Sequence, residues 1–279
     1  MKHDLKIKDH FLSKEVFNVV EHSEGVLKTQ PNLDEKNLSK YYDSSQYSSH
    51  NDIGGFIGFL YSLSAYIMLR VKFRTLVKYV NKESLIVDFG CGTGRFLSYL
   101  KKKKYTVVGV DSNKKVRDKC SEKNLKIYKS INDFKENIDT ITFWHSFEHV
   151  SNPNEILDQI VNQSKNNLTV IIALPNYRSF DAKHYGSFWA AYDVPRHRYH
   201  YSARGIKKLM KSYGFECLKA KPMLLDAFYI SIMSEKYKKS KLYFVKGIIF
   251  GLVSNLLGLF SSSYSSSVFV FKKNNLEAF

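Results

Sequence analysis

The middle of the chain alternates between short apolar runs and longer stretches whose apolar residues recur at helical spacing. The apolar runs predict buried strands, and the amphipathic stretches predict helices. The expected strands are Leu85–Phe89, Tyr105–Val110, Lys126–Tyr128, Thr140–Trp144 and Leu168–Leu174. The expected helices are Arg95–Lys102, Lys114–Lys123 and Asn154–Ser164. Strands that alternate with such helices predict an α/β fold with a doubly wound, mostly parallel sheet.

The pattern changes on both sides of this core. Residues 1–82 contain strand-like pieces at Phe17–Val20 and Gly25–Thr29 and a helical pattern over Phe56–Val80. We expect them to form an N-terminal extension with cap helices. Residues 83–279 should form the second domain, with a helical insertion at about 224–262 before the last strand. Its later elements are a helix over Ala203–Tyr213 and strands over Glu216–Lys221 and Ser267–Lys272.

Two apolar stretches, Ile53–Leu69 and Tyr243–Phe260, resemble membrane spans in composition. Both are at or below the roughly 20 residues that a span needs, and both are interrupted by glycine and serine. In the second stretch the small or polar residues recur at helical spacing, which indicates a helix with one less apolar face. We therefore expect packed helices and a protein soluble without detergent. Contact with a membrane surface is the alternative.

Basic residues outnumber acidic ones by 43 to 26, which gives a formal net charge of +17. Such an excess favours anionic partners or simply reflects solvated lysine-rich faces. The basic clusters lack the interleaved aromatic residues of a nucleic-acid platform, which argues against nucleic acid as a partner. The three cysteines form no CxxC pair, which argues against a disulfide framework or thiolate zinc site. The charged segment Met1–His10 does not resemble a signal peptide, so we expect a cytoplasmic protein.

The strongest chemical signal follows the first predicted core strand. Asp88 precedes a turn with glycine at positions 90, 92 and 94, and a helix begins at once. Glycines let a ligand approach the backbone, and the helix N-terminus offers free N–H donors. Asp111 ends the next strand, 23 residues after Asp88. This is near the spacing at which a carboxylate meets ribose hydroxyls.

The spacing of the glycines distinguishes between nucleotide-like ligands. A dinucleotide site has the pattern G-x-G-x-x-G, whereas here Gly94 comes one position early. The pattern Asp-x-Gly-x-Gly-x-Gly is typical of S-adenosylmethionine-dependent methyltransferases. A nicotinamide or flavin site, or a turn without a ligand, are the alternatives.

On these motifs, residues 84–175 resemble the core of the class I methyltransferases, which have a Rossmann-like fold. Ile141–Val150 is similar to their fourth motif, and its Glu-His-Val end is typical of the type 11 and type 12 groups. The segment Asn176–Ser202 is similar to bacterial type 12 enzymes. The resemblance implies S-adenosyl-L-methionine as cofactor. The residues it implies as cofactor-binding are Asp88, Gly90, Cys91, Gly92, Gly94, Asp111, Ser112, Ile131, Trp144 and His145.

Two further resemblances concern metals. Some type 12 relatives have an N-terminal zinc ribbon with two CxxC pairs, but Glu21–Gly25 stands where one pair would fall, so we expect this segment to fold without metal. The ubiquinone-pathway O-methyltransferases are more distantly similar, and there a carboxylate near the Glu-His pair helps to hold a divalent cation. His145 takes that place here. We expect no metal, and a site of His145, Glu148 and His149 is the alternative.

The resemblance also suggests which residues act on the acceptor. His149 follows the fourth core strand at its carboxyl end, where ligands of doubly wound sheets gather, and is our candidate base. The alternative is a histidine at a helix start that is hydrogen-bonded to the backbone. Arg196 and His200 lie in a long loop after the fifth strand, and we expect this loop to form the acceptor side. Three tyrosines are candidates to close the donor pocket from the N-terminal side: Tyr41, Tyr42 and Tyr47. The alternative is that they are aromatic residues of the core.

The sequence thus predicts an S-adenosylmethionine-dependent methyltransferase acting on a small-molecule or lipid-like acceptor. The acceptor atom is expected to be oxygen, and quinone-, sugar- and lipid-like acceptors all agree with the loop. No obligate protein partner is expected. The alternatives are a nucleic-acid methyltransferase, which the charge favours but the motifs do not, and a non-catalytic S-adenosylmethionine-binding protein.

Overall fold

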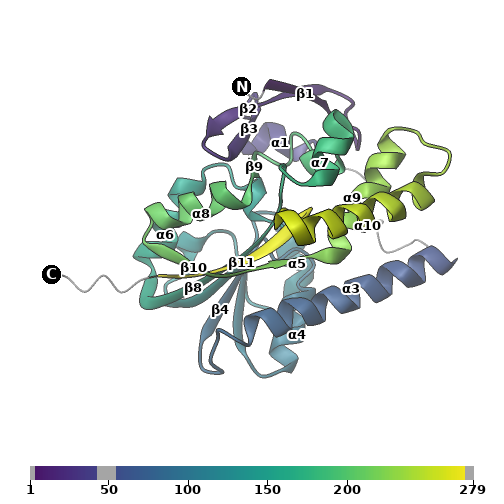
Figure 1. Cartoon of the computed structure of the whole chain (residues 1–279). Coiled ribbons are helices and arrows are strands. Elements are labelled where there is room, and N and C mark those ends of the chain that lie inside the picture. The colour runs from purple at the N-terminus through teal and green to yellow at the C-terminus, as the bar shows by residue number, and fades with distance from the viewer. Residues whose placement is uncertain (1–3, 43–54, 274–279) are drawn as a thin grey trace.

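The computed structural model describes residues 4–42 and 55–273. Its centre is a seven-stranded sheet with the order β10-β11-β8-β7-β4-β5-β6 (Figure 1). The strands from β8 to β6 pair in parallel, whereas β11 runs antiparallel to both of its neighbours. The predicted α/β fold class, with a doubly wound and mostly parallel Rossmann-like sheet, is confirmed.

The central strands match the apolar runs of the sequence. They are β4 (Leu85–Phe89), β5 (Thr106–Val110), β6 (Ile127–Tyr128), β7 (Ile138–Trp144), β8 (Ser164–Pro175), β10 (Phe215–Pro222) and β11 (Ser266–Lys273). The main difference is at β8, which begins at Ser164, where the sequence pattern predicted the end of a helix. That helix, α6 (Pro153–Asn162), ends two residues earlier than expected.

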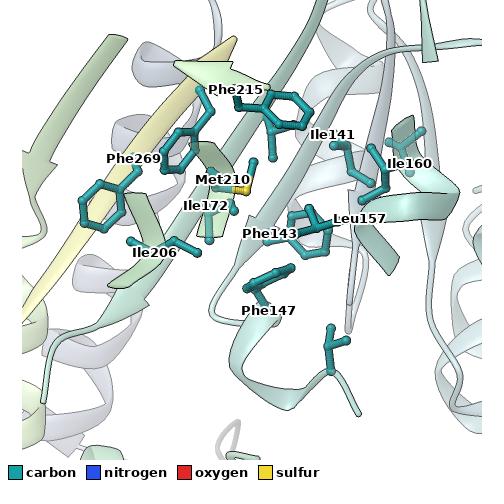
Figure 2. Close-up of a cluster of buried hydrophobic side chains, with 14 of the residues drawn as sticks. Ile141, Phe143, Phe147, Leu157, Ile160, Ile172, Ile206, Met210, Phe215 and Phe269 are labelled. Atoms are coloured by element: carbon teal, nitrogen blue, oxygen red, sulfur yellow. The ribbon is translucent and has the colours of Figure 1, made fainter. Parts of the chain in front are cut away.

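Helices cover both faces of the sheet (Figure 1). On one face, α6 and α8 (Ala203–Ser212) pack against alternate residues of β4, β7 and β8. Figure 2 shows this cluster, in which Phe143, Leu157, Ile172 and Met210 are buried. On the other face lie α3 (Gly55–Leu76), α4 (Arg95–Lys102) and α5 (Lys114–Ser121). The inner strands β4, β7 and β8 therefore bury both faces, as their nearly continuous apolar sequences predict, whereas the edge strand β10 is mostly exposed.

A second, four-stranded sheet has the order β1-β2-β3-β9. Three strands come from the N-terminus: β1 (Asp4–Lys8), β2 (Val16–Ser23) and β3 (Val26–Gln30), followed by the short helix α1 (Glu35–Ser39). The fourth, β9 (Tyr199–Tyr201), comes from the loop after β8 and pairs with β3. The sequence predicted neither β1 nor β9. The N-terminal extension therefore shares its sheet with the loop that follows the fifth core strand.

The predicted helical insertion lies between β10 and β11, where it forms α9 (Leu224–Tyr237) and α10 (Tyr243–Ser261). The two helices pack side by side (Figure 1). A buried aspartate, Asp181 of α7 (Phe180–Tyr185), accepts hydrogen bonds of 2.7 Å from Trp189 Nε1, Ser254 Oγ and Ser265 Oγ. This carboxylate ties α10 to α7 and to the start of β11. α10 is also the one described helix that is long and apolar enough to cross a membrane.

Candidate active site

The turn between β4 and α4 has the conformation that its glycines predict. Gly90, Gly92 and Gly94 have φ angles of 68°, 52° and 70°, in the left-handed region that glycine adopts without strain. A Cβ atom on Gly90 would lie 2.5 Å from Ser146 Cβ, and one on Gly94 would lie 2.6 Å from Leu125 Cδ1. A Cβ on Gly92 would meet no atom within 4 Å. Gly92 thus lines open space beside the turn, while its neighbours are needed for close packing.

Asp111, at the end of β5, is directly connected to this turn. Its Oδ2 accepts a hydrogen bond from the Gly92 N–H at 3.1 Å, and its Oδ1 accepts one from the Asn113 N–H at 2.9 Å. Burial raises the pKa of Asp111, and these two N–H donors oppose the rise. Each oxygen keeps a lone pair for a further donor. The predicted carboxylate therefore lies at the open side of the turn, with Ser112 exposed beside it.

Asp88 lies behind the turn, buried in β4. Its Oδ1 accepts a hydrogen bond of 2.7 Å from the Thr142 hydroxyl. Burial raises the pKa of Asp88 to about 6, and the nearby Lys72 ammonium opposes this rise. Lys72 comes from α3, where its Nζ lies 5.1 Å from the centre of the Trp144 ring. Burial lowers the pKa of Lys72, while Asp88 and Asp226 oppose the decrease.

Lys72 was not predicted from the sequence. A lysine in a helix usually indicates a solvated face, and Lys72 lies between Arg70 and Arg74 in a basic stretch, so the sequence does not distinguish it from its neighbours. The Trp144 ring at the end of β7 is buried, and its Nε1 has no hydrogen-bond partner among the described residues. The turn therefore has a cation, a carboxylate and an unpaired N–H donor close by.

His145 follows β7 with a φ of 56°, a conformation uncommon outside glycine. Its Nε2 lies 3.0 Å from Asp226 Oδ2 of α9, and its Nδ1 lies 3.5 Å from Glu148 Oε1. Burial lowers the pKa of His145, but the two carboxylates outweigh this effect and raise it to about 10. At neutral pH His145 is thus a cation that joins the end of β7 to the helical insertion.

His149 lies in the 3₁₀ helix η3 (Phe147–His149) with a defined tautomer. Its Nδ1 is 3.0 Å from the Arg196 carbonyl oxygen and 3.1 Å from the Tyr42 hydroxyl. Because a carbonyl only accepts, Nδ1 carries the proton and Nε2 has the lone pair. Burial lowers the pKa of His149 to about 4. The imidazole is neutral at pH 7 and can accept a proton at Nε2.

Glu148, His149 and His197 each place one ligand atom within 4.8 Å of the others, a geometry that can hold a cation. His197 Nδ1 is 2.8 Å from the Ala191 carbonyl, which leaves its Nε2 as the acceptor. Neither carboxylate oxygen of Glu148 has a hydrogen-bond partner among the described residues, although His145 is nearby. The alternative metal set named from the sequence differs, because His145 turns toward Asp226 and His197 takes the third place.

Arg196 has a different environment from the one predicted. Its side chain is 1% exposed, and its guanidinium donates to Asp193 Oδ1 at 2.7 Å and to Asp9 Oδ1 at 2.9 Å. A further bond goes to the Tyr41 carbonyl. The expectation that Arg196 faces an acceptor is corrected to a buried clasp between the loop and the N-terminal sheet, because its donors are already paired inside the protein.

His200 is also buried, and its Nε2 is 2.9 Å from Thr29 Oγ1 of β3. Burial lowers its pKa to about 3. Together with Glu148 and His197 it lines a small internal cavity. This environment favours a role in holding β9 against β3, and direct contact with an acceptor stays a prediction.

The remaining predicted residues are divided between the turn and the core. Cys91 lies in the turn, where burial raises its pKa. Ile131, expected at the adenine, is 1% exposed and packs in the core beyond β6. Tyr41 is buried and donates to Glu15 Oε2, whereas Tyr42 contacts His149. Tyr47 lies outside the described residues.

The comparisons with known proteins agree with this geometry. The model of a methyltransferase domain matches residues 66–220, more than half of the 279 residues. The chain belongs to the methyltransferase-domain family. No curated protein matches it significantly. The cofactor expected from the sequence, S-adenosylmethionine, is the one that this family and its structural neighbours support.

Solved methyltransferases share the fold at low identity. A SAM-dependent methyltransferase from Archaeoglobus fulgidus has a TM-score of 0.51 and 20% identity, covering 74% of this chain and 93% of that one. Magnesium protoporphyrin IX methyltransferase from Synechocystis PCC 6803, with bound SAH, has a TM-score of 0.58 and 13% identity, covering 86% and 100%. The O-MT segment of StiE has a TM-score of 0.56 and 15% identity, covering 84% and 83%. At these identities the likeness is one of fold.

Proposed function

We propose that this methyltransferase domain transfers the methyl group of S-adenosylmethionine to an oxygen atom of a small or lipid-like acceptor. The observation that carries the proposal is the open space beside Gly92, bordered by Asp111 and followed on the same sheet edge by His149. β4, β5 and β7 are parallel, so the residues that follow them meet at their carboxyl ends.

The residues beside the turn suit the chemistry of this donor. Asp111 would hold the ribose hydroxyls through its remaining lone pairs. The charged methionine end carries an ammonium and a carboxylate, for which Asp88 and Lys72 supply opposite charges. When bound, the donor supplies a methyl group on a positively charged sulfur.

The chain itself supplies a base that can take a proton from the methyl acceptor. A hydroxyl must lose its proton as the new carbon–oxygen bond forms. His149 suits this task because its Nδ1 proton is directed to the Arg196 carbonyl, which leaves Nε2 unprotonated.

Donor binding tests the first half of the proposal. Calorimetric titration of the full chain with S-adenosylhomocysteine should show one site. Asp111→Ala should weaken binding by about 1–3 kcal/mol, the usual loss for a hydrogen bond to a charged group. The exposed carboxylate Asp118 of α5 provides a control, because Asp118→Ala should leave affinity unchanged. Equal binding by wild type and Asp111→Ala would place the donor elsewhere.

Transfer of a labelled methyl group tests the second half. The protein is incubated with radiolabelled S-adenosylmethionine and either a hydroxylated small-molecule panel or a total lipid extract, and label is measured in the water and chloroform phases. An alkali-labile product indicates a methyl ester, whereas an ether survives. Donor binding without transfer to any acceptor would support the non-catalytic alternative. Transfer to RNA or DNA would support the nucleic-acid alternative.

A further inference from the structure

The helix α10 packs with its small residues inward. Gly247, Gly251 and Gly258 are buried, as is Ser254. A Cβ atom on Gly247 would lie 2.5 Å from Ile232, and one on Gly251 would lie 2.8 Å from Phe228, both in α9. The predicted stripe of small residues is therefore the face on which α10 lies against α9.

The outward face of α10 is formed by large apolar residues. Five of them follow one another at intervals of four and three positions and are 48–64% exposed: Val245, Ile249, Leu252, Leu256 and Leu259. Phe260, at the end of the helix, is 88% exposed. Single exposed apolar residues are normal, but a continuous face of them indicates an interaction surface. The usual arrangement of a surface helix, polar outside and apolar inside, is reversed here.

The charged residues of the insertion indicate what covers this face. Its lysines are all exposed: Lys236, Lys238, Lys239, Lys241 and Lys246. Its two acidic residues are not available to balance them, because Asp226 pairs with His145 and Glu235 is 2% exposed. Lys238 and Lys239 also line an open groove with Lys6 and Lys8 of β1. An apolar helix face with uncompensated lysines at its N-terminal end and in the segment before it matches an anionic lipid surface.

The contacts of α10 distinguish lying on a bilayer from crossing it. A spanning helix would have to leave α9 and break the hydrogen bond from Ser254 Oγ to the buried Asp181 carboxylate. Keeping both contacts leaves only the outer face free for lipid. We propose that α10 docks in the plane of a bilayer that contains anionic lipids, with its leucines at the acyl boundary and the lysines at its N-terminal end on the phosphates.

Docking of this kind has a consequence for the acceptor, which rests on the proposed function. α9 starts at the candidate site, where Asp226 contacts His145, and α10 packs along α9. A bilayer under α10 therefore lies next to the insertion that borders the site. A lipid-borne acceptor fits this arrangement best.

Vesicle co-sedimentation of the full chain tests the docking. We expect binding to vesicles of phosphatidylcholine with phosphatidylglycerol, and much weaker binding to phosphatidylcholine alone or at high salt. L252S/L256S/L259S should lower vesicle affinity by about tenfold or more, because three exposed apolar side chains that would enter the lipid are lost. K238E/K239E/K241E should remove the preference for phosphatidylglycerol. Leu218→Ser, at an apolar residue 44% exposed in β10, is the matched control and should bind as wild type does.

Two results would overturn the inference. One is no binding of wild type to either vesicle, and the other is undiminished binding of the triple serine variant. Sedimentation velocity is measured in parallel. A wild-type dimer that the serine variant converts to a monomer, without vesicle binding, would make this face a subunit interface instead. Titration with S-adenosylhomocysteine on the same variants keeps the outcomes separate, because docking does not require donor binding.

Discussion

Arg196 offers the sharpest test of the described geometry. Arg196→Ala leaves two carboxylates without their cation, a change that costs about 3–5 kcal/mol when the pair is fully buried. The lower end applies here. Asp9 keeps hydrogen bonds from the N–H groups of Phe11, Leu12 and Ser13, and Asp193 is 25% exposed to water. We therefore expect a loss of about 3 kcal/mol, or roughly 6–12 °C in Tm.

Chemical and thermal unfolding with and without S-adenosylhomocysteine measure this effect. The matched control is Arg204→Ala, which removes an exposed ion pair with Glu24 and should cost less than about 1 kcal/mol. Arg196→Lys should be intermediate, because it keeps the charge but loses the planar donor pair. A stable Arg196→Ala variant that binds donor normally but transfers no methyl group would refute the clasp. That result would restore Arg196 to the acceptor side, as the sequence predicted.

Three further predictions concern the site. Gly92→Val should abolish S-adenosylhomocysteine binding by calorimetry, whereas Gly214→Val, also at a positive φ with open space around it, should not; equal binding by both would move the donor away from the turn. His149→Ala should slow methyl transfer by about 10²–10⁴-fold if His149 is the base, whereas the control variant His22→Ala should not. EDTA should leave the rate of the wild type unchanged. If EDTA instead lowers the rate, and Mn²⁺ restores it in the wild type but not in His197→Ala, the Glu148, His149 and His197 cluster binds a cation. Burial lowers the pKa of His200 to about 3, so between pH 3 and the ordinary histidine pKa of about 6.5 the unfolded chain binds more protons than the folded one. The free energy of unfolding should therefore fall as the pH decreases through this window. His200→Gln should make this fall less steep in acid denaturation curves.

The parts of the fold predicted from the sequence depend on local signals. β4, the glycine turn and α4 are adjacent in the chain, and their pattern of apolar residues and glycines defines them without distant information. Asp111 could be placed at the same edge because it ends the neighbouring parallel strand. For the same reason His149 was placed correctly after β7.

The features that were missed or misplaced depend on residues far apart in the sequence. Arg196 resembles a loop arginine until its partner Asp9, 187 positions earlier, is placed beside it. Lys72 is half-buried because α3 packs it against the rings of Trp144 and Phe96, which are far from it in the sequence. The spacing of the small residues in α10 predicted one face of small residues and one of large apolar residues. The sequence pattern did not indicate which of these two faces packs against the protein.

The pairing of β9 with β3 has a consequence for protein design. The main chain of the loop after β8 is held by residues of the N-terminal extension, through Thr29 to Arg198 and Gly25 to Ser202. A fragment limited to the family-matched residues 66–220 would leave β9 as an uncovered edge, which promotes aggregation. A loop grafted from a related enzyme should likewise transfer that enzyme's specificity only if the first 30 residues of the same enzyme are grafted with it. The reason is that substitutions at residues in contact are not additive. The two segments therefore have to be exchanged as one unit.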